Sequence, residues 1–102
     1  MTNVEEIKRT LLQHKAELKK KFKVKTIGVF GSYVRGEQKR GSDVDILVEF
    51  EEDAEIGFFK FLDLEEFLSR KLGVKVDLVT KNALKPYIGK CILQEVIMIE
   101  EA

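Results

Sequence analysis

The chain has 102 residues, of which 44% are hydrophobic and 35% charged, and its 18 Lys and Arg side chains balance its 18 Asp and Glu side chains. This composition is typical of a soluble folded protein and excludes extensive disorder, because a disordered chain has fewer apolar residues. The length fits one domain, residues 1–102. A net charge of zero does not support direct nucleic-acid binding through the field of the whole molecule.

Charge is unevenly distributed along the chain. The first quarter is rich in lysine, and the stretch from 43 to 66 is acidic. A solvated helix face explains the lysine run, and a docking surface for an acidic partner or RNA is the alternative.

Simple sequence features exclude a protein held together by disulfides or by cysteine-bound zinc, and one that spans a membrane. Cys91 is the only cysteine, so neither an intramolecular disulfide nor a zinc site of several cysteines can form, and we expect a buried, inert thiol. The N-terminus is charged rather than apolar, unlike a signal peptide. Since no apolar run approaches the roughly 18–20 residues of a membrane span, we expect no membrane association and a cytoplasmic protein.

Helical spacing of apolar residues predicts an amphipathic helix from the N-terminus to about Lys21. Its apolar stripe comprises Val4, Ile7, Leu11, Leu12, Leu18 and Phe22. Thr2 followed by Glu5 resembles a capping box, which would start this helix. A β-strand is predicted over 24–30, and it runs directly into a glycine-serine turn at 31–32.

Residues 44–50 (VDILVEF) form the clearest strand pattern in the chain. Because side chains alternate along a strand, one face is apolar and the other carries acids. The apolar face has Val44, Ile46, Val48 and Phe50, and the other has Asp43, Asp45, Leu47 and Glu49. A polar loop over 36–42 precedes this strand, and an acidic loop over 51–55 follows it.

The second half predicts a helix, a strand and a last helix. The helix spans 58–72, with Gly73 as its C-terminal stop. Its apolar and aromatic residues recur at helical spacing, which favours a place in the core: Phe58, Phe61, Leu62, Leu64, Phe67, Leu68 and Leu72. A strand follows over 74–79, and a helix begins near Pro86. The tail 96–99 is compatible with a short strand. This order predicts an α/β or α+β fold, with a small sheet of three to four strands covered by helices on at least one face.

Three aspartates suggest a metal site. Asp43 and Asp45 lie two residues apart on a strand and point to the same side, where their repulsion calls for a cation. Asp77 is a charged residue within the apolar strand 74–79, where a charge is unfavourable unless it is paired or binds a metal. If the two strands pair, three carboxylates converge, and such a set can hold two Mg²⁺ ions about 3.5–4 Å apart for phosphoryl chemistry.

The glycine-serine turn suggests a phosphate site. Gly31 and Ser32 follow a strand and could begin a helical turn, whose free backbone N–H groups suit an anion. Arg35 can add a fixed positive charge, or it can be a surface arginine. Ser42 is a further nucleotide-binding candidate, with bracing of the loop before Asp43 as the alternative. A P-loop is excluded because Glu37 and Gln38 stand where Lys and Ser or Thr are required.

The segment GSYVRGEQKRGSDVDILVEF, together with the strand KVDLV around Asp77, is similar to the signature of DNA polymerase beta-like nucleotidyltransferases. The resemblance is closest to the minimal nucleotidyltransferases, or MNT proteins, and covers nearly the whole chain. It implies a small mixed sheet flanked by helices, with Asp43, Asp45 and Asp77 as catalytic metal ligands. It also implies that Gly31 and Ser32 grip the triphosphate, with ATP as the donor.

The resemblance also implies a biological setting. MNT proteins are associated with HEPN-domain toxins encoded nearby, and some act as antitoxins by attaching AMP to the toxin. We therefore expect a Mg²⁺-dependent transfer of AMP from ATP to a protein. A non-catalytic antitoxin that inhibits its partner by occupancy is the first alternative. Transfer to a small molecule of the aminoglycoside type, with a homo-oligomer or separate subunit completing the pocket, is the second.

Overall fold

The computed structural model describes residues 3–83 and 86–99, without the side chains of 82, 86–88 and 91. It contains a four-stranded mixed sheet in the order β3-β2-β1-β4. The strands are β1 (Val24–Phe30), β2 (Val44–Phe50), β3 (Val76–Thr80) and β4 (Ile97–Met98). β2 and β3 run parallel, while β1 is antiparallel to both of its neighbours. The expected fold class, a small mixed sheet flanked by helices, is confirmed.

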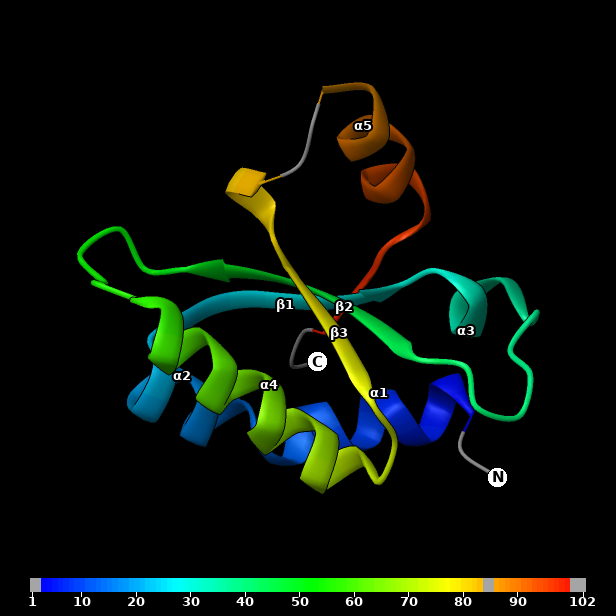
Figure 1. Cartoon of the computed structure of the whole chain (residues 1–102), viewed down its shortest axis with the longest axis horizontal. Helices are drawn as coiled ribbons and strands as arrows, with labels where there is room; N and C mark the ends of the chain where they lie inside the picture. Colours follow the sequence, from blue (N-terminus) through cyan, green and yellow to red (C-terminus); the bar gives the residue numbers. More distant parts are fainter. Residues whose placement is uncertain (1–2, 84–85, 100–102) are drawn as a thin grey trace.

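Helices cover the two faces of this sheet unequally (Figure 1). α1 (Val4–Gln13), α2 (Lys15–Phe22) and α4 (Phe58–Leu72) pack on one face. α5 (Pro86–Glu95) lies on the opposite side and leads into β4. The opposite face is therefore only partly covered.

Two short helical turns follow strands of the sheet, one between β1 and β2 and one between β3 and α5. α3 (Ser32–Arg35) follows β1 directly, as the glycine-serine turn predicted. The 3-10 turn η1 (Lys81–Ala83) follows β3. Both turns therefore lie where a strand of the sheet ends.

The sequence predicts one N-terminal helix, but the structure has two, α1 and α2, which are separated at His14. Leu11 of α1 and Leu18 of α2 are both buried, so both helices contribute to the core. The expected Thr2–Glu5 capping box is replaced by Asn3, whose Oδ1 accepts a hydrogen bond from the Glu6 N–H at 3.0 Å. Thr2 itself lies outside the described residues.

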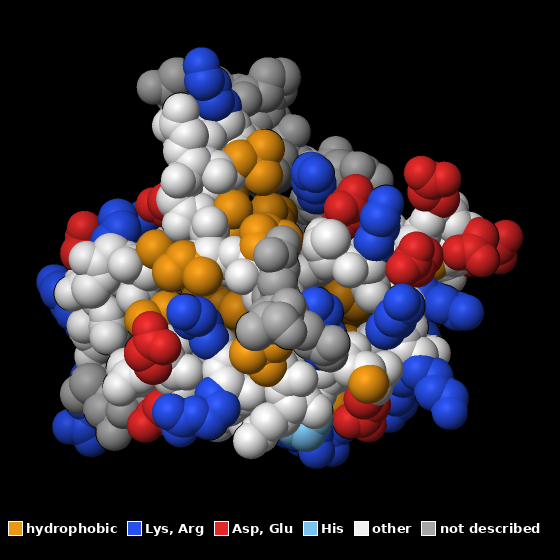
Figure 2. Space-filling model, turned by 180° about the vertical axis from the view of Figure 1, so that it is seen from behind, with side chains coloured by type: hydrophobic (Ala, Val, Ile, Leu, Met, Phe, Trp, Pro, Cys, Tyr) orange, Lys and Arg blue, Asp and Glu red, His pale blue; other side chains and the backbone are white. Residues whose placement is uncertain are grey.

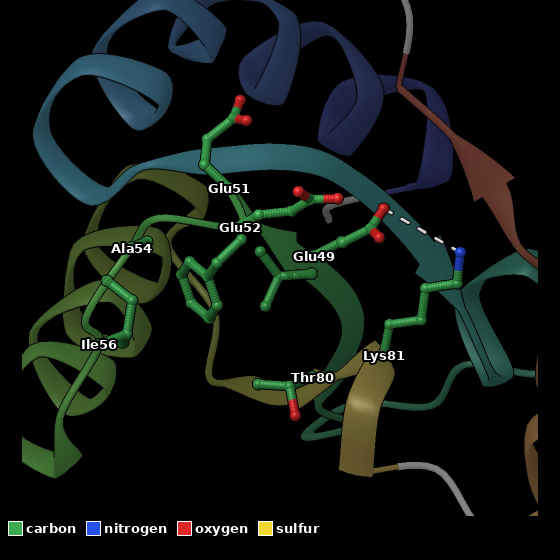
Figure 3. Close-up of a pocket in the computed structure, with 9 residues that line it drawn as sticks. Glu49, Glu51, Glu52, Ala54, Ile56, Thr80 and Lys81 are labelled. Carbon is green, nitrogen blue, oxygen red and sulfur yellow. Dashed lines mark ion pairs between the residues drawn. The ribbon is translucent and has the colours of Figure 1, made fainter.

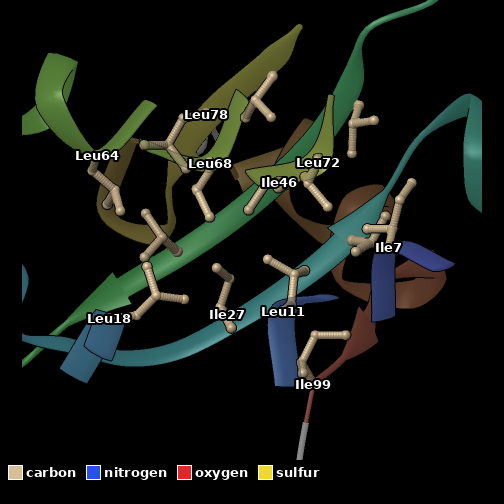
Figure 4. Close-up of a cluster of buried hydrophobic side chains, with 14 of the residues drawn as sticks. Ile7, Leu11, Leu18, Ile27, Ile46, Leu64, Leu68, Leu72, Leu78 and Ile99 are labelled. Carbon is tan, nitrogen blue, oxygen red and sulfur yellow. The ribbon is translucent and has the colours of Figure 1, made fainter. Parts of the chain in front are cut away.

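A single apolar core fills the space between the sheet and the three helices (Figure 4). The strand residues in it alternate along the chain, as the sequence pattern predicts: Val44, Ile46 and Val48 from β2, and Val76 and Leu78 from β3. Ile46 and Leu68 are each at most 1% exposed. Burial of such side chains contributes about 1.5–3 kcal/mol each to folding.

The predicted stripe of α4 is only partly in the core. Its buried residues begin at Leu64, whereas Phe58 and Leu62 are 64% and 41% exposed. The expectation of core packing is therefore wrong for Phe58 and Leu62, while Phe61 packs against the core from a partly buried position. The C-terminal end follows the prediction, because Gly73 adopts a left-handed conformation with φ of 72° and ends the helix.

The remaining sequence expectations differ in outcome. β3 begins at Val76 rather than at Val74, and the short C-terminal strand is confirmed as β4. The side chain of Cys91 lies outside the described ones, so its expected burial stays a prediction. Within residues 3–83 and 86–99, none of the helices is long and apolar enough to cross a membrane.

Candidate active site

Strand pairing brings the predicted carboxylates together on the face of the sheet opposite the core. β2 and β3 are paired in parallel with Asp45 directly opposite Asp77. Asp43 comes immediately before β2 and projects to the same side as Asp45. Asp43 and Asp45 are half-buried, and Asp77 is exposed. The three side chains therefore share one solvent-accessible surface.

The environment of Asp45 shows how close these acids lie. Loss of hydration raises the pKa of the Asp45 carboxyl above its ordinary 3.8, and the negative charges of Asp77 and Asp43 raise it further. The positive charge of Arg35 acts in the opposite direction. A smaller upward contribution comes from a hydrogen bond with the Asp77 side chain. Proton or cation binding is thus favoured at Asp45.

The donor chemistry of this group fits a hard divalent cation, because carboxylate oxygens are the ligands that Mg²⁺ prefers. In their present orientations, no three His, Cys, Asp or Glu side chains among the described residues form a group that could hold a metal ion. The backbone positions of Asp43, Asp45 and Asp77 are those expected, and the metal role of the three side chains stays a prediction.

Gly31 lies in contact with the side chain of Asp45. It has φ of 81°, a conformation that glycine adopts without strain. A Cβ atom at this position would overlap Oδ2 of Asp45. The carboxylate of Asp45 therefore lies directly against the turn that was predicted to hold phosphate, and a larger residue cannot replace Gly31 without displacing it.

The turn continues into α3, which begins at Ser32. Gly31 O accepts hydrogen bonds from the N–H groups of Val34 and Arg35, at 3.1 and 3.2 Å. Ser32 is half-buried, and its carbonyl accepts a hydrogen bond from the Glu37 N–H at 2.9 Å. The structure thus places Gly31 against Asp45, with Ser32 next to it at the start of α3.

Arg35 is bound to two carboxylates. Its Nη1 donates to Glu95 Oε1 at 3.1 Å and to Oε2 at 3.0 Å, and its Nε donates to Glu37 at 3.3 Å. The hydrogen bond to Glu95, then that to Glu37, raises the pKa of Arg35 above its ordinary value. Arg35 therefore stays charged beside the turn.

Glu95 is a site residue that sequence reasoning missed. It is the last residue of α5, and Oε1 accepts a hydrogen bond from the Gly31 N–H at 2.9 Å. A lone acid at the end of an apolar helix carries no recognisable signal, and it is far from Gly31 in the chain. The contact depends on where α5 packs.

Ser42 lies on the loop that leads to Asp43. Its Oγ accepts a hydrogen bond from the Lys39 N–H at 2.8 Å, and its carbonyl accepts one from the Tyr33 hydroxyl at 3.5 Å. These contacts match the bracing interpretation of Ser42. Its nucleotide-binding role stays a prediction.

A pocket lies further along the same strands (Figure 3). It is lined by the C-terminal end of β2, the acidic loop after it, Thr80 and Lys81, and contains none of the three aspartates. Glu49 accepts a hydrogen bond from the Thr26 hydroxyl at 3.2 Å and pairs with Lys81 at 4.0 Å. Glu49 is on the same side of β2 as Asp45, but it is already paired.

Charged side chains of both signs surround the apolar centre of the face seen in Figure 2, and among the described residues they form no large field of one sign there. This distribution agrees with the net charge of zero. Steering of a polyanion such as nucleic acid has no support on this face.

Comparison with known proteins identifies relatives of the whole chain. The nucleotidyltransferase domain family matches residues 11–99. The protein adenylyltransferase MntA of Thermococcus cleftensis is 54% identical over 99 residues, which cover 97% of this chain and 98% of the relative.

Solved structures share the fold. One, described as a candidate minimal nucleotidyltransferase, is 32% identical with a TM-score of 0.76, covering 94% of this chain and 95% of the other. Another comes from the complex of a tri-AMPylated Shewanella oneidensis HEPN toxin with an MNT antitoxin. It has a TM-score of 0.64 and 18% identity over 93% of this chain and 73% of the other, so this likeness concerns the fold alone.

Proposed function

Because the chain belongs to the nucleotidyltransferase domain family, we propose that it transfers AMP from ATP to a protein acceptor. The observation that carries this proposal is the pairing of Asp45 with Asp77 on the accessible face, with Asp43 nearby and Gly31 against Asp45. The name of the Thermococcus relative, a protein adenylyltransferase, supports the choice of acceptor class.

Asp43, Asp45 and Asp77 would hold Mg²⁺, which supplies positive charge to oxygens of the triphosphate and the reacting phosphoryl group when bound. Asp77 is exposed and interacts with Asp45 through its side chain, which supports a shared role of the two carboxylates in holding the ion. Gly31 and Ser32 would receive the β- and γ-phosphates, with Arg35 and Ser42 as further candidates. The paired acids alone would repel a triphosphate, so the cation is needed for donor binding.

The reaction proposed is a substitution at phosphorus. An acceptor hydroxyl oxygen forms a bond to the α-phosphorus, and the bond from that phosphorus to the bridging oxygen of the β-phosphate breaks. Pyrophosphate leaves with the electron pair, and the hydroxyl proton passes to a base. We assign this proton to Asp77, and its exposure, which leaves it open to an acceptor, supports the assignment.

The acceptor proposed is a HEPN-domain protein, with the chain acting as its antitoxin. The complex of a tri-AMPylated HEPN toxin with an MNT antitoxin, whose fold this chain shares, supports this choice. A cytoplasmic location, where ATP and Mg²⁺ are abundant, belongs to the same proposal.

The test is a transfer assay with ATP labelled at the α-phosphate, Mg²⁺ and the HEPN-domain protein encoded beside this chain. We expect label on the acceptor with the wild type and a loss of about 100-fold or more with Asp43→Asn, Asp45→Asn or Asp77→Asn, since even the partners of metal ligands contribute roughly 10- to 100-fold. Glu49→Gln is the matched control, because Glu49 shares the strand and face of Asp45 but lies outside the site.

A parallel reaction with ATP labelled at the γ-phosphate separates adenylyl from phosphoryl transfer. Transfer of γ-label would contradict the proposal. So would inhibition of the HEPN protein by all three asparagine variants without any α-label, because occupancy alone would then account for the antitoxin effect.

A further inference from the structure

The carboxylate of Glu95 occupies two of the groups proposed to receive the donor triphosphate. Gly31 N–H donates to Oε1 at 2.9 Å, and Arg35 Nη1 donates to both oxygens at 3.0 and 3.1 Å. These three hydrogen bonds join the end of α5 to the turn after β1.

Carboxylate and phosphate oxygens compete for such donors because both are anionic acceptors of N–H groups and of guanidinium. A backbone N–H that is donating to Glu95 at 2.9 Å is not available to a phosphate oxygen in the same direction. Binding of a phosphate at Gly31 therefore requires that the Glu95 side chain move away.

At the position of Glu95, an unfavourable interaction with its own helix opposes the favourable contacts with Arg35 and Gly31. An acid at the C-terminal end of a helix is repelled by the helix dipole, and the last turn of α5 contains no basic residue. Arg35 and the Gly31 N–H offset that repulsion. Both partners of the ion pair are in contact with water, with side-chain exposures of 46% and 27%, so the pair is weak enough to be exchanged.

We propose that Glu95 is an internal competitor of the donor triphosphate, whose carboxylate holds the Gly31 N–H and Arg35 until the phosphates displace it. This inference rests on the proposed function, because it takes Gly31 and Arg35 as phosphate ligands. A rotation of the Glu95 side chain suffices for the exchange, while β4, paired with β1 at Gly28 and Val29, keeps the end of α5 in place.

The test measures dissociation constants of the full chain for a non-hydrolysable ATP analogue, tripolyphosphate and adenosine, each with Mg²⁺. Glu95→Gln keeps the shape and removes the charge. We expect it to bind the analogue and tripolyphosphate about two- to fivefold more tightly than the wild type does, the range set by a half-exposed ion pair. Adenosine binding should not change, and the gain should shrink at high salt.

Glu37→Gln is the matched control, because it removes the other carboxylate partner of Arg35 and leaves the Gly31 contact intact. We expect a smaller gain from it than from Glu95→Gln. If Glu95→Gln binds the ATP analogue no more tightly than the wild type, the competitor role is wrong and Glu95 only positions the turn. If neither the wild type nor the variants bind the analogue, the proposed function fails together with this inference.

An NMR titration of the wild type keeps the test decisive if Glu95→Gln does not fold. Tripolyphosphate should shift the Gly31 amide resonance and the side-chain carboxyl resonance of Glu95 together, with the same midpoint. A shift of Gly31 with an unchanged Glu95 carboxyl would overturn the exchange.

Discussion

The two faces of β2 are built from alternate residues of one strand, yet they differ in burial and in charge. On the helix-covered face, Val44, Ile46 and Val48 are completely buried. On the opposite face Leu47 is buried too, but Asp45 and Glu49 on either side of it are in contact with water and carry charge. The buried face stabilises the fold, whereas the other face places like charges together at some cost in stability. A site of this kind needs the stable face beneath it to hold repelling groups in register.

The largest effect is expected from the buried face. Ile46→Ala should lower the free energy of unfolding by about 2–5 kcal/mol, because it leaves a cavity in a packed core. Urea unfolding followed by circular dichroism measures this. Glu49→Ala, on the same strand but facing water, is the control and should change stability by less than about 0.5 kcal/mol beyond loss of its weak ion pair. Equal losses from both would contradict the division between the faces.

Gly31→Ala should have the next largest effect, because it strains the backbone and also displaces a side chain of the site. The residue has φ of 81°, and a Cβ would overlap the Asp45 carboxylate. We expect a loss of more than about 1 kcal/mol in the free energy of unfolding, with a loss of AMP transfer to the acceptor. Thermal unfolding and the transfer assay measure the two. Gly36→Ala also has positive φ but open space around it, so it should lose stability with little effect on transfer.

Asp45→Asn should act in the opposite direction and stabilise the protein at neutral pH without metal, by about 1 kcal/mol or less because the site is solvated. The pKa of Asp45 is raised in the folded state, so its proton stabilises the fold at low pH, and that contribution is lost as pH rises through the folded pKa. The difference between variant and wild type should therefore vanish below the ordinary pKa of 3.8 and grow above it. Urea unfolding in EDTA across pH 3–7 would check this, and a constant difference would contradict it.

The smallest effect is expected at the first turn of α4. Phe59 is 81% exposed, so Phe59→Ser should change the free energy of unfolding by about 0.5 kcal/mol or less. Phe67→Ser, on the buried part of the same helix, should unfold or severely destabilise the protein. Chemical denaturation of the two variants compares them, and a large loss with Phe59→Ser would place this turn in the core.

Some parts of the site could be predicted because their signals are local. The acids at 43 and 45 alternate with apolar residues, and Gly31-Ser32 interrupts a strand pattern. Periodicity also located every strand to within two residues. The break at His14 and the exposed start of α4 were not predicted, since the helical spacing of apolar residues continues through both segments.

The sequence by itself determined which face of each strand is apolar and where the chain turns, because alternation, helical spacing and glycine conformations act between near neighbours. Tertiary structure alone decided the rest of the site. Asp45 meets Asp77 because β2 pairs with β3 in one register, and a slip of one residue would turn Asp77 to the other face. Glu95 meets Gly31 and Arg35 because α5 ends beside the turn after β1, a contact that only packing of the distant segments creates.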